Sequence, residues 1–421
     1  PCGHGQEIGN HPAGTGRSTD LTPCGHGQET GRSRDLTPCG HGQEIGNHPA
    51  GTGRSRDLTP CGHGLETGRS TETEPCACGG RSRDLTPSRS DKEQFMESAI
   101  TLFTFVVLAM ILVLANMEQY HRAFRWLTLA ILALLNLFFM LLGVSGLALE
   151  GLTDTVQMPD AVLTAYVSLF RVMGIAGLLA FLPMLPPVRR LLARVLFINP
   201  ASTVHTTALV YAIYLLGSGI GQQPLMSNPE ALEGLEAVGG VSAAAIWSQA
   251  LGMVLVAVSG VGLFTRRSLR QVAERLDLRV PTVRQVLVGA GAVVVLFALQ
   301  IGVTAGWQAL DPEGLAQIDD ASSLLLGNLT GLSGAFTVGM AAALGEELIF
   351  RGALQPVFRL LPTALLFTLL HSQYAITPAT VLILIIALIL GVVRNRTNLT
   401  IAILVHFAYN FLSVILAGAG Q

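Results

Sequence analysis

Apolar residues dominate the chain from about residue 96 onward, in long runs that polar segments separate. Because about 20 apolar residues in a helix span a hydrocarbon layer of about 30 Å, such runs are typical of transmembrane helices. We predict about ten spans, at roughly 98–117, 124–148, 160–184, 203–221, 241–264, 285–306, 331–350, 362–374, 378–393 and 399–417. The pattern therefore predicts an all-α, polytopic membrane helix bundle whose eighth span is short enough to be re-entrant.

The segments between the predicted spans alternate in charge. Arginines follow the first, third, fifth, seventh and ninth spans, and acidic residues follow the second, fourth and sixth. The positive-inside rule then places the arginine segments on the cytoplasmic side. The basic segment 266–281 divides an N-terminal half of unknown role, residues 96–284, from a C-terminal half, residues 285–421.

Residues 1–95 form a segment of another kind. Residues 1–37 recur almost unchanged at 38–74 and are rich in glycine, proline, threonine and arginine. A chain with so few bulky apolar side chains cannot offset the entropy of ordering itself, so we predict a disordered, low-complexity segment. The first methionine after this repeat is Met96, which favours the interpretation that the repeat precedes the true start of the protein.

The cysteines narrow the possible chemistry. All six lie in the repeat, at Cys2, Cys24, Cys39, Cys61, Cys76 and Cys78. Most belong to isolated Cys-Gly-His units, whereas structural zinc sites usually combine two closely spaced ligand pairs, so we expect no metal site there. The membrane part contains no cysteine, which excludes disulfides and a catalytic thiol from it.

Composition agrees with a membrane protein. The 421 residues are 50% hydrophobic and 13% charged, with a mean hydropathy of +0.52. The net charge of −2 and the absence of a clustered basic face give no indication of nucleic-acid binding. We therefore expect the lipid bilayer, and molecules within it, as partners.

Ionisable side chains are rare inside the predicted spans after residue 330. They cost about 2.5–3.5 kcal/mol each on insertion scales, and so are functional candidates. These residues, with one amide, are Glu346, Glu347, Arg351, His371, His406 and Asn410. Their predicted depths along three spans agree within about 10 Å at 1.5 Å per residue, so they could converge on one cavity.

Helical spacing separates the roles of these residues. Glu347 and Arg351 are four residues apart with the acid first, the favoured order for an ion pair. Glu346 is rotated by about 100° from Glu347 and has no such local partner, so it is the acid expected to be free for chemistry. His406 and Asn410 are also four residues apart and share one helical face, as do Phe367 and His371.

This set of side chains suits amide hydrolysis. A carboxylate beside an imidazole can take a proton from water. A second histidine with an asparagine can donate hydrogen bonds to a developing oxyanion. The membrane part has neither a G-x-S-x-G nor an H-E-x-x-H motif, so the sequence supports neither an acyl-enzyme nor a zincin route.

Three segments in order resemble the CPBP family of intramembrane proteases, also called the CAAX protease and bacteriocin-processing, or Abi, family. They are "EELIFRG" (346–352), "FTLLH" (367–371) and "HFAYN" (406–410), which match E-E-x-x-x-R, F-x-x-x-H and H-x-x-x-N/D. Together they are a fairly specific signal, whereas E-E-x-x-x-R alone is weak. The resemblance covers roughly residues 285–418.

The resemblance implies a glutamate-dependent intramembrane endopeptidase. Glu346 would activate water with His371, and His406 with Asn410 would form the oxyanion hole. Glu347, Arg351 and Phe367 would support the site. It further implies a membrane protein or peptide as substrate and a bacterial cytoplasmic membrane as location, and we expect a metal-independent route over a zinc one.

Two other function classes remain open. Chains of glutamate and histidine also relay protons in proton-coupled transporters, although residues 96–284 contain no copy of the pattern that an inverted repeat would show. The same polar residues could join helices in a catalytically inactive membrane scaffold or regulator. Loss of function on Glu346→Gln would distinguish a protease from a scaffold.

Overall fold

The computed structural model describes residues 89–151, 160–228, 241–327, 329, 331–374 and 376–419. Most of the predicted repeat, up to residue 88, lies outside the described residues. Throughout the described part the regular elements are helices and no strand occurs, which confirms the all-α prediction.

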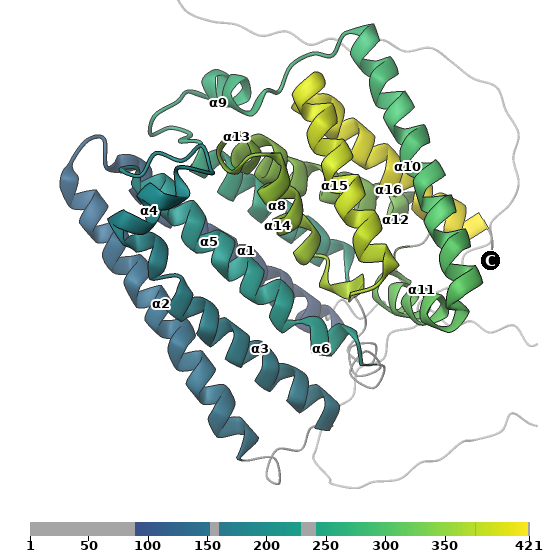
Figure 1. Ribbon diagram of the computed structural model, residues 1–421, viewed down its shortest axis with the longest axis horizontal. Helices are drawn as coiled ribbons and strands as arrows, with labels where there is room; N and C mark the ends of the chain where they lie inside the picture. The colour runs from purple at the N-terminus through teal and green to yellow at the C-terminus, as the bar shows by residue number, and fades with distance from the viewer. Residues whose placement is uncertain are drawn as a thin grey trace, which may run out of the picture. The chain divides into compact units, whose positions relative to one another are not determined.

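In its described residues, the N-terminal half has five long helices with short elements between them (Figure 1). The long helices are α1 (Arg89–Met117), α2 (Arg122–Glu150), α3 (Asp160–Leu179), α5 (Thr203–Gly221) and α8 (Ala243–Gly260). The short elements are η2 (Leu182–Met184), α4 (Pro186–Leu192) and α6 (Gln223–Met226).

The C-terminal half begins with the amphipathic helix α9 (Leu269–Leu276). The elements that follow are α10 (Val283–Leu310), α11 (Pro312–Leu326), α12 (Gly331–Glu347), η3 (Leu348–Leu354), α13 (Gln355–Phe358), α14 (Leu360–Leu369), η4 (Ser372–Tyr374), α15 (Pro378–Arg396) and α16 (Leu399–Ala419). In Figure 1, α12, α15 and α16 lie together, with α10 beside them.

Nine helical segments of the described chain are long and apolar enough to cross a membrane. They agree in number and order with the predicted spans, apart from the eighth. There α14 has 10 residues, or about 15 Å at 1.5 Å per residue. This is too short to cross a bilayer of about 30 Å, as its length in the sequence predicted. The chain is an integral membrane protein.

The arginine segments meet at one end of the helices. Three backbone or side-chain hydrogen bonds join segments that are far apart in sequence: Arg266 Nε to the Asn116 carbonyl, Phe197 N to the Val357 carbonyl and Leu399 N to the Asp277 carbonyl, at 3.2, 2.7 and 3.1 Å. Arg275 Nη1, 3.3 Å from the Gly352 carbonyl, links the segments after the fifth and seventh spans, so together these contacts confirm that the basic segments share one side. That this side is cytoplasmic stays a prediction.

Helix α8 joins the two halves of the bundle. On one side its Gly252 lies against the ring of Phe105 in α1, so closely that a Cβ there would be 2.4 Å from ring atoms. On the other side Ala250 packs on Gly345 of α12, where a Cβ would lie 3.1 Å from the Ala250 Cα. Small residues permit this close approach of helices in a membrane, and it brings the N-terminal half directly behind the residue that precedes Glu346.

Candidate active site

The two adjacent glutamates end α12, and the chain then continues as the π-helical segment η3. Pro356 contributes to this irregularity, because it has no N–H to donate to the Gly352 carbonyl four residues earlier. Arg275 of α9 fills part of this gap, with its Nη1 3.3 Å from that carbonyl. Short π-helical segments are frequent at functional sites, and this one contains Arg351 and directly follows the two glutamates.

Glu347 and Arg351 form a fully buried ion pair. Their side chains are 0% and 1% exposed, and Arg351 Nη1 lies 3.1 Å from Glu347 Oε1. The guanidinium of Arg351 also lies over the ring of Phe367, 4.1 Å from its centroid, which is a favourable cation–π distance. The predicted i, i+4 pair is confirmed.

His406 lies between the two glutamates. Its Nδ1 is 2.9 Å from Glu347 Oε1, and its Nε2 is 3.9 Å from Glu346 Oε2. The sequence interpretation paired Glu346 with His371, but no nitrogen of His371 lies within 4.0 Å of Glu346 in the described chain. The fold thus places His406 of α16, rather than His371, next to the glutamates at the end of α12.

The hydrogen bond of His406 restricts what its ring can do. A carboxylate accepts hydrogen bonds, so Nδ1 carries a hydrogen toward Glu347. A neutral imidazole then has an acceptor at Nε2, and only an imidazolium can donate from Nε2 as well. Donation to an oxyanion from Nε2 therefore requires the imidazolium form of His406.

His371 has the complementary arrangement. It directly follows the last turn of α14, and its Nδ1 lies 2.9 Å from the Phe367 carbonyl oxygen. Because a carbonyl oxygen can only accept, Nδ1 carries the hydrogen and Nε2 keeps a lone pair. The imidazole also packs on the Phe367 ring, with centroids 4.5 Å apart. These contacts orient His371 as a base.

One cavity of about 1720 Å³ brings the candidate residues together. Its lining includes Glu346, Phe367, His371, His406 and Asn410. Glu347 and Arg351 do not line the cavity and lie behind this surface. The four residues predicted to carry chemistry therefore share one space, and the predicted supporting pair lies outside it.

The carboxylate of Glu346 is the free acid of this site. Its side chain is 17% exposed, compared with 0% for Glu347. Its Oε2, like that of Glu347, is buried without a hydrogen-bond partner in the described structure, but only Glu346 lines the cavity. Buried polar atoms normally have a partner, so this oxygen is suited to a water or substrate group in the cavity.

Sequence reasoning missed part of the cavity wall. The Oγ of Ser413 on α16 and the Oε1 of Gln300 on α10 line the cavity and are buried without a partner in the described structure. Ser413 lies one helical turn after Asn410, and that spacing was the signal that could have found it. No local sequence pattern distinguishes Gln300.

The residues of the described chain provide no evident metal centre. No group of three or more histidine, cysteine, aspartate or glutamate side chains there is arranged to hold a metal ion. Glu347, which is nearest to His406, is already shared with Arg351. The metal-independent route stays a prediction.

Comparison with protein families assigns the segment that contains this site. Residues 328–412 match the family described as "Type II CAAX prenyl endopeptidase Rce1-like". These residues are a domain of the Rce1-like CAAX protease family. No curated protein and no solved structure matches the chain.

The Rce1-like domain contains all seven residues that the sequence singled out, from Glu346 to Asn410. It extends from the start of α12 into α16 and leaves out α10, which the predicted resemblance had included. The family indicates a protease, and hence a hydrolase, embedded in the membrane with a protein or peptide as substrate.

Proposed function

We propose that the chain is an intramembrane endopeptidase that uses water activated by Glu346 and needs no metal. The supporting observation is that Glu346, His371, His406 and Asn410 all belong to the Rce1-like segment and line a single cavity. Glu346 has a buried carboxylate oxygen without a partner, which suits a general base.

Glu346 and His371 are assigned to the water. The Glu346 carboxylate removes a proton from a water in the cavity as the oxygen attacks the substrate carbonyl. His371 Nε2, which has a lone pair because Nδ1 donates to Phe367, accepts a second hydrogen bond from this water. The proton then passes from Glu346 to the nitrogen of the leaving amine as the C–N bond breaks, so each turnover consumes one water and restores the Glu346 carboxylate.

His406 and Asn410 are assigned to the oxyanion. Asn410 follows His406 by one turn of α16, so both present donors along one line of the cavity. Glu347 fixes the orientation of the His406 ring, while Arg351 balances the charge of Glu347. Donors held in place before the reaction are worth the most in a site shielded from water.

The test is cleavage of a membrane-tethered peptide library by the full chain in liposomes. Wild type is expected to release products that Glu346→Gln does not release, while Glu274→Gln, on the exposed face of α9, cleaves like wild type. Equal cleavage by Glu346→Gln would remove the proposed base. Movement of protons across the liposome membrane without cleavage would favour the transporter instead.

A further inference from the structure

One end of the cavity is basic. Its lining includes Arg266 and Arg267 from the α8–α9 connection, Arg275 from α9, and His205 from the first turn of α5. Arg267, Arg275 and His205 are half-buried, and Arg266 is exposed. Four cationic or hydrogen-donating groups from three parts of the fold thus face the space that contains Glu346.

The three arginines lack acidic partners. Each donates an N–H to a backbone carbonyl, for example Arg266 Nε to Asn116 at 3.2 Å and Arg275 Nη1 to Gly352 at 3.3 Å. Throughout the described residues, none of the three has a carboxylate oxygen within 4.0 Å. A carbonyl carries only a partial charge, so most of the guanidinium charge stays uncompensated.

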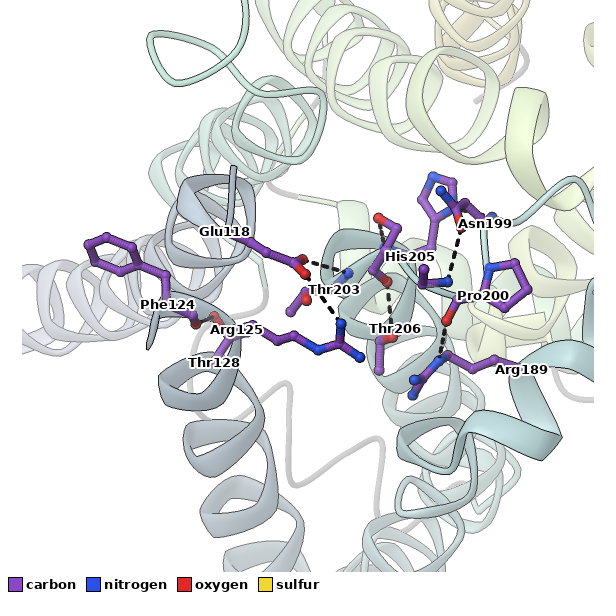
Figure 2. A network of polar contacts seen from close by, with 12 residues as sticks. Glu118, Phe124, Arg125, Thr128, Arg189, Asn199, Pro200, Thr203, His205 and Thr206 are labelled. Carbon is purple, nitrogen blue, oxygen red and sulfur yellow. Dashed lines mark hydrogen bonds and ion pairs between the residues drawn. The ribbon is translucent and has the colours of Figure 1, made fainter. Parts of the chain in front are cut away.

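The acids at this end are committed to other arginines. The pairs are Glu118 with Arg125, Glu274 with Arg270, and Asp277 with Arg279, at 3.5, 3.1 and 2.7 Å. Figure 2 shows the Glu118 carboxylate directed at the Arg125 guanidinium and at the backbone N–H of Thr203, which lies 3.2 Å from it. None of these acids turns toward the cavity-lining arginines.

His205 adds a donor of known direction. Its Nδ1 accepts the backbone N–H of Asn199 at 2.7 Å. An imidazole that accepts at Nδ1 carries its hydrogen at Nε2, so His205 presents an Nε2–H for which the described chain provides no acceptor. This donor lines the same cavity as the arginines.

Gathering these groups has an energetic cost. Burial lowers the pKa of Arg275 from its ordinary value, and the neighbouring charges of Arg267 and Arg394 lower it further. Like charges that repel each other in a partly buried site are costly unless an anion compensates them. The positive charge of the cluster is therefore uncompensated, and a bound anion would stabilise it.

We propose that Arg266, Arg267, Arg275 and His205 form an anion-binding subsite of the cavity, which takes a carboxylate or phosphate group of the substrate. This inference rests on the proposed function and adds a substrate class to it. Guanidinium groups present several N–H donors in a plane that matches the oxygens of these anions.

The subsite has a defined position relative to the reacting acid. Arg275 bonds to the Gly352 carbonyl, six residues after Glu346 along one continuous helical segment. At 1.5 Å per residue this is at most about 9 Å along the axis. An anion held there positions the rest of the substrate along the cavity toward Glu346, and such positioning lowers the barrier to reaction.

A lipid headgroup is the other source of such an anion. The exposed arginines of the same segment, among them Arg270 and Arg279, face away from the cavity and suit lipid phosphates at the membrane surface. The cavity-lining arginines share their space with Glu346 instead, which favours a group that enters with the substrate.

The first experiment measures binding of pyrophosphate to the full chain in an uncharged detergent by isothermal titration calorimetry. Arg267→Gln/Arg275→Gln is expected to bind at least about tenfold more weakly than wild type, which corresponds to about 1.4 kcal/mol. His205→Ala, which leaves the Gly352 contact intact, is expected to weaken binding severalfold. Arg270→Gln removes the same charge from the exposed face of α9 and should bind like wild type.

Equal affinities for wild type, the double variant and His205→Ala, or no saturable binding by wild type, would overturn the subsite. Thermal unfolding identifies a double variant that fails to fold, and His205→Ala then decides alone. The difference between wild type and the double variant is expected to persist in nanodiscs containing phosphatidylglycerol. Its disappearance there would assign the site to lipid and overturn the substrate assignment.

The second experiment links the subsite to cleavage. Tethered peptides that wild type cleaves are compared with versions whose acidic groups are replaced by amides. Neutral versions should show KM raised about tenfold with wild type and unchanged with Arg267→Gln/Arg275→Gln. An equal KM for both versions with wild type would overturn the proposal.

The two proposals fail in different ways. Glu346→Gln is expected to keep its affinity for pyrophosphate while losing cleavage. Binding without any cleavage by wild type would therefore count against the protease alone. Cleavage without preference for an anionic group would count against the subsite alone.

Discussion

The two glutamates of α12 are adjacent in sequence and lie in contrasting surroundings. Glu347 is fully buried, forms an ion pair with Arg351 and accepts from His406. Each of the two has one carboxylate oxygen without a hydrogen-bond partner in the described structure, but only Glu346 lines the cavity. A rotation of about 100° per residue along one helix separates a structural acid from a chemical one.

This contrast explains why a charged pair is retained in the interior. A buried ion pair is often no more stabilising than apolar residues of the same size. Here the pair has another consequence, because the Glu347 oxygen that faces Arg351 Nη1 also fixes the ring of His406. Arg351 in turn lies over Phe367, whose carbonyl orients His371. One ion pair thus orients both histidines.

The largest expected effect is that of replacing Glu346, the glutamate that lines the cavity, on the rate of cleavage. Glu346→Gln keeps the size of the side chain but removes the base, so the rate of peptide cleavage should fall by about 10²–10⁴. The thermal unfolding temperature should stay close to that of wild type, because Glu346 Oε2 has no hydrogen-bond partner to lose and its contact with His406 Nε2 is long, at 3.9 Å. Initial rates on a tethered peptide in liposomes provide the check. A rate within tenfold of wild type would show that the two glutamates do not differ as proposed.

The next largest effect is that of breaking the buried Glu347–Arg351 pair on the free energy of unfolding. Arg351→Met leaves the Glu347 carboxylate without its cation in the interior, and removing one partner of a buried pair costs about 3–5 kcal/mol. Denaturant unfolding in detergent measures this loss. The matched control is Arg270→Met in α9, whose ion pair is 90% exposed on the arginine side and should contribute about 0–1 kcal/mol. Similar stabilities for the two variants would contradict the structural role of Arg351.

A third effect separates the oxyanion donors from the rest of the cavity wall. Asn410→Ala should lower kcat by about 10²–10³ with little change in KM, as loss of an oxyanion donor does elsewhere. Ser413→Ala, one turn further along α16 and also on the cavity wall, should change kcat only severalfold. A larger effect of Ser413→Ala than of Asn410→Ala on kcat would show that Ser413, and not Asn410, donates to the oxyanion.

The sequence predicted the spans and the Glu347–Arg351 pair because both depend on periodicity along a single helix. The arrangement of His406 was beyond such reasoning, because it depends on how closely α16 approaches the end of α12. The π-helical segment was equally hidden, although Pro356 gave an indication of it. The contribution of α1, α5 and α8 to the cavity wall had no signal in sequence, because ordinary apolar helix faces form it.

The smallest expected effect tests whether packing of the N-terminal half against α12 positions Glu346. Gly345→Ala adds a Cβ that would lie 3.1 Å from the Ala250 Cα, so α8 and α12 must separate slightly. Such overpacking costs about 1–3 kcal/mol. Because Gly345 precedes Glu346, cleavage should also fall severalfold. Gly291→Ala is the control: its Cβ would meet nothing within 4 Å, and alanine in place of glycine inside a helix stabilises by about 0.5–1 kcal/mol. If the two alanine variants unfold at the same temperature and cleave at the same rate, the contact between α8 and α12 does not position Glu346.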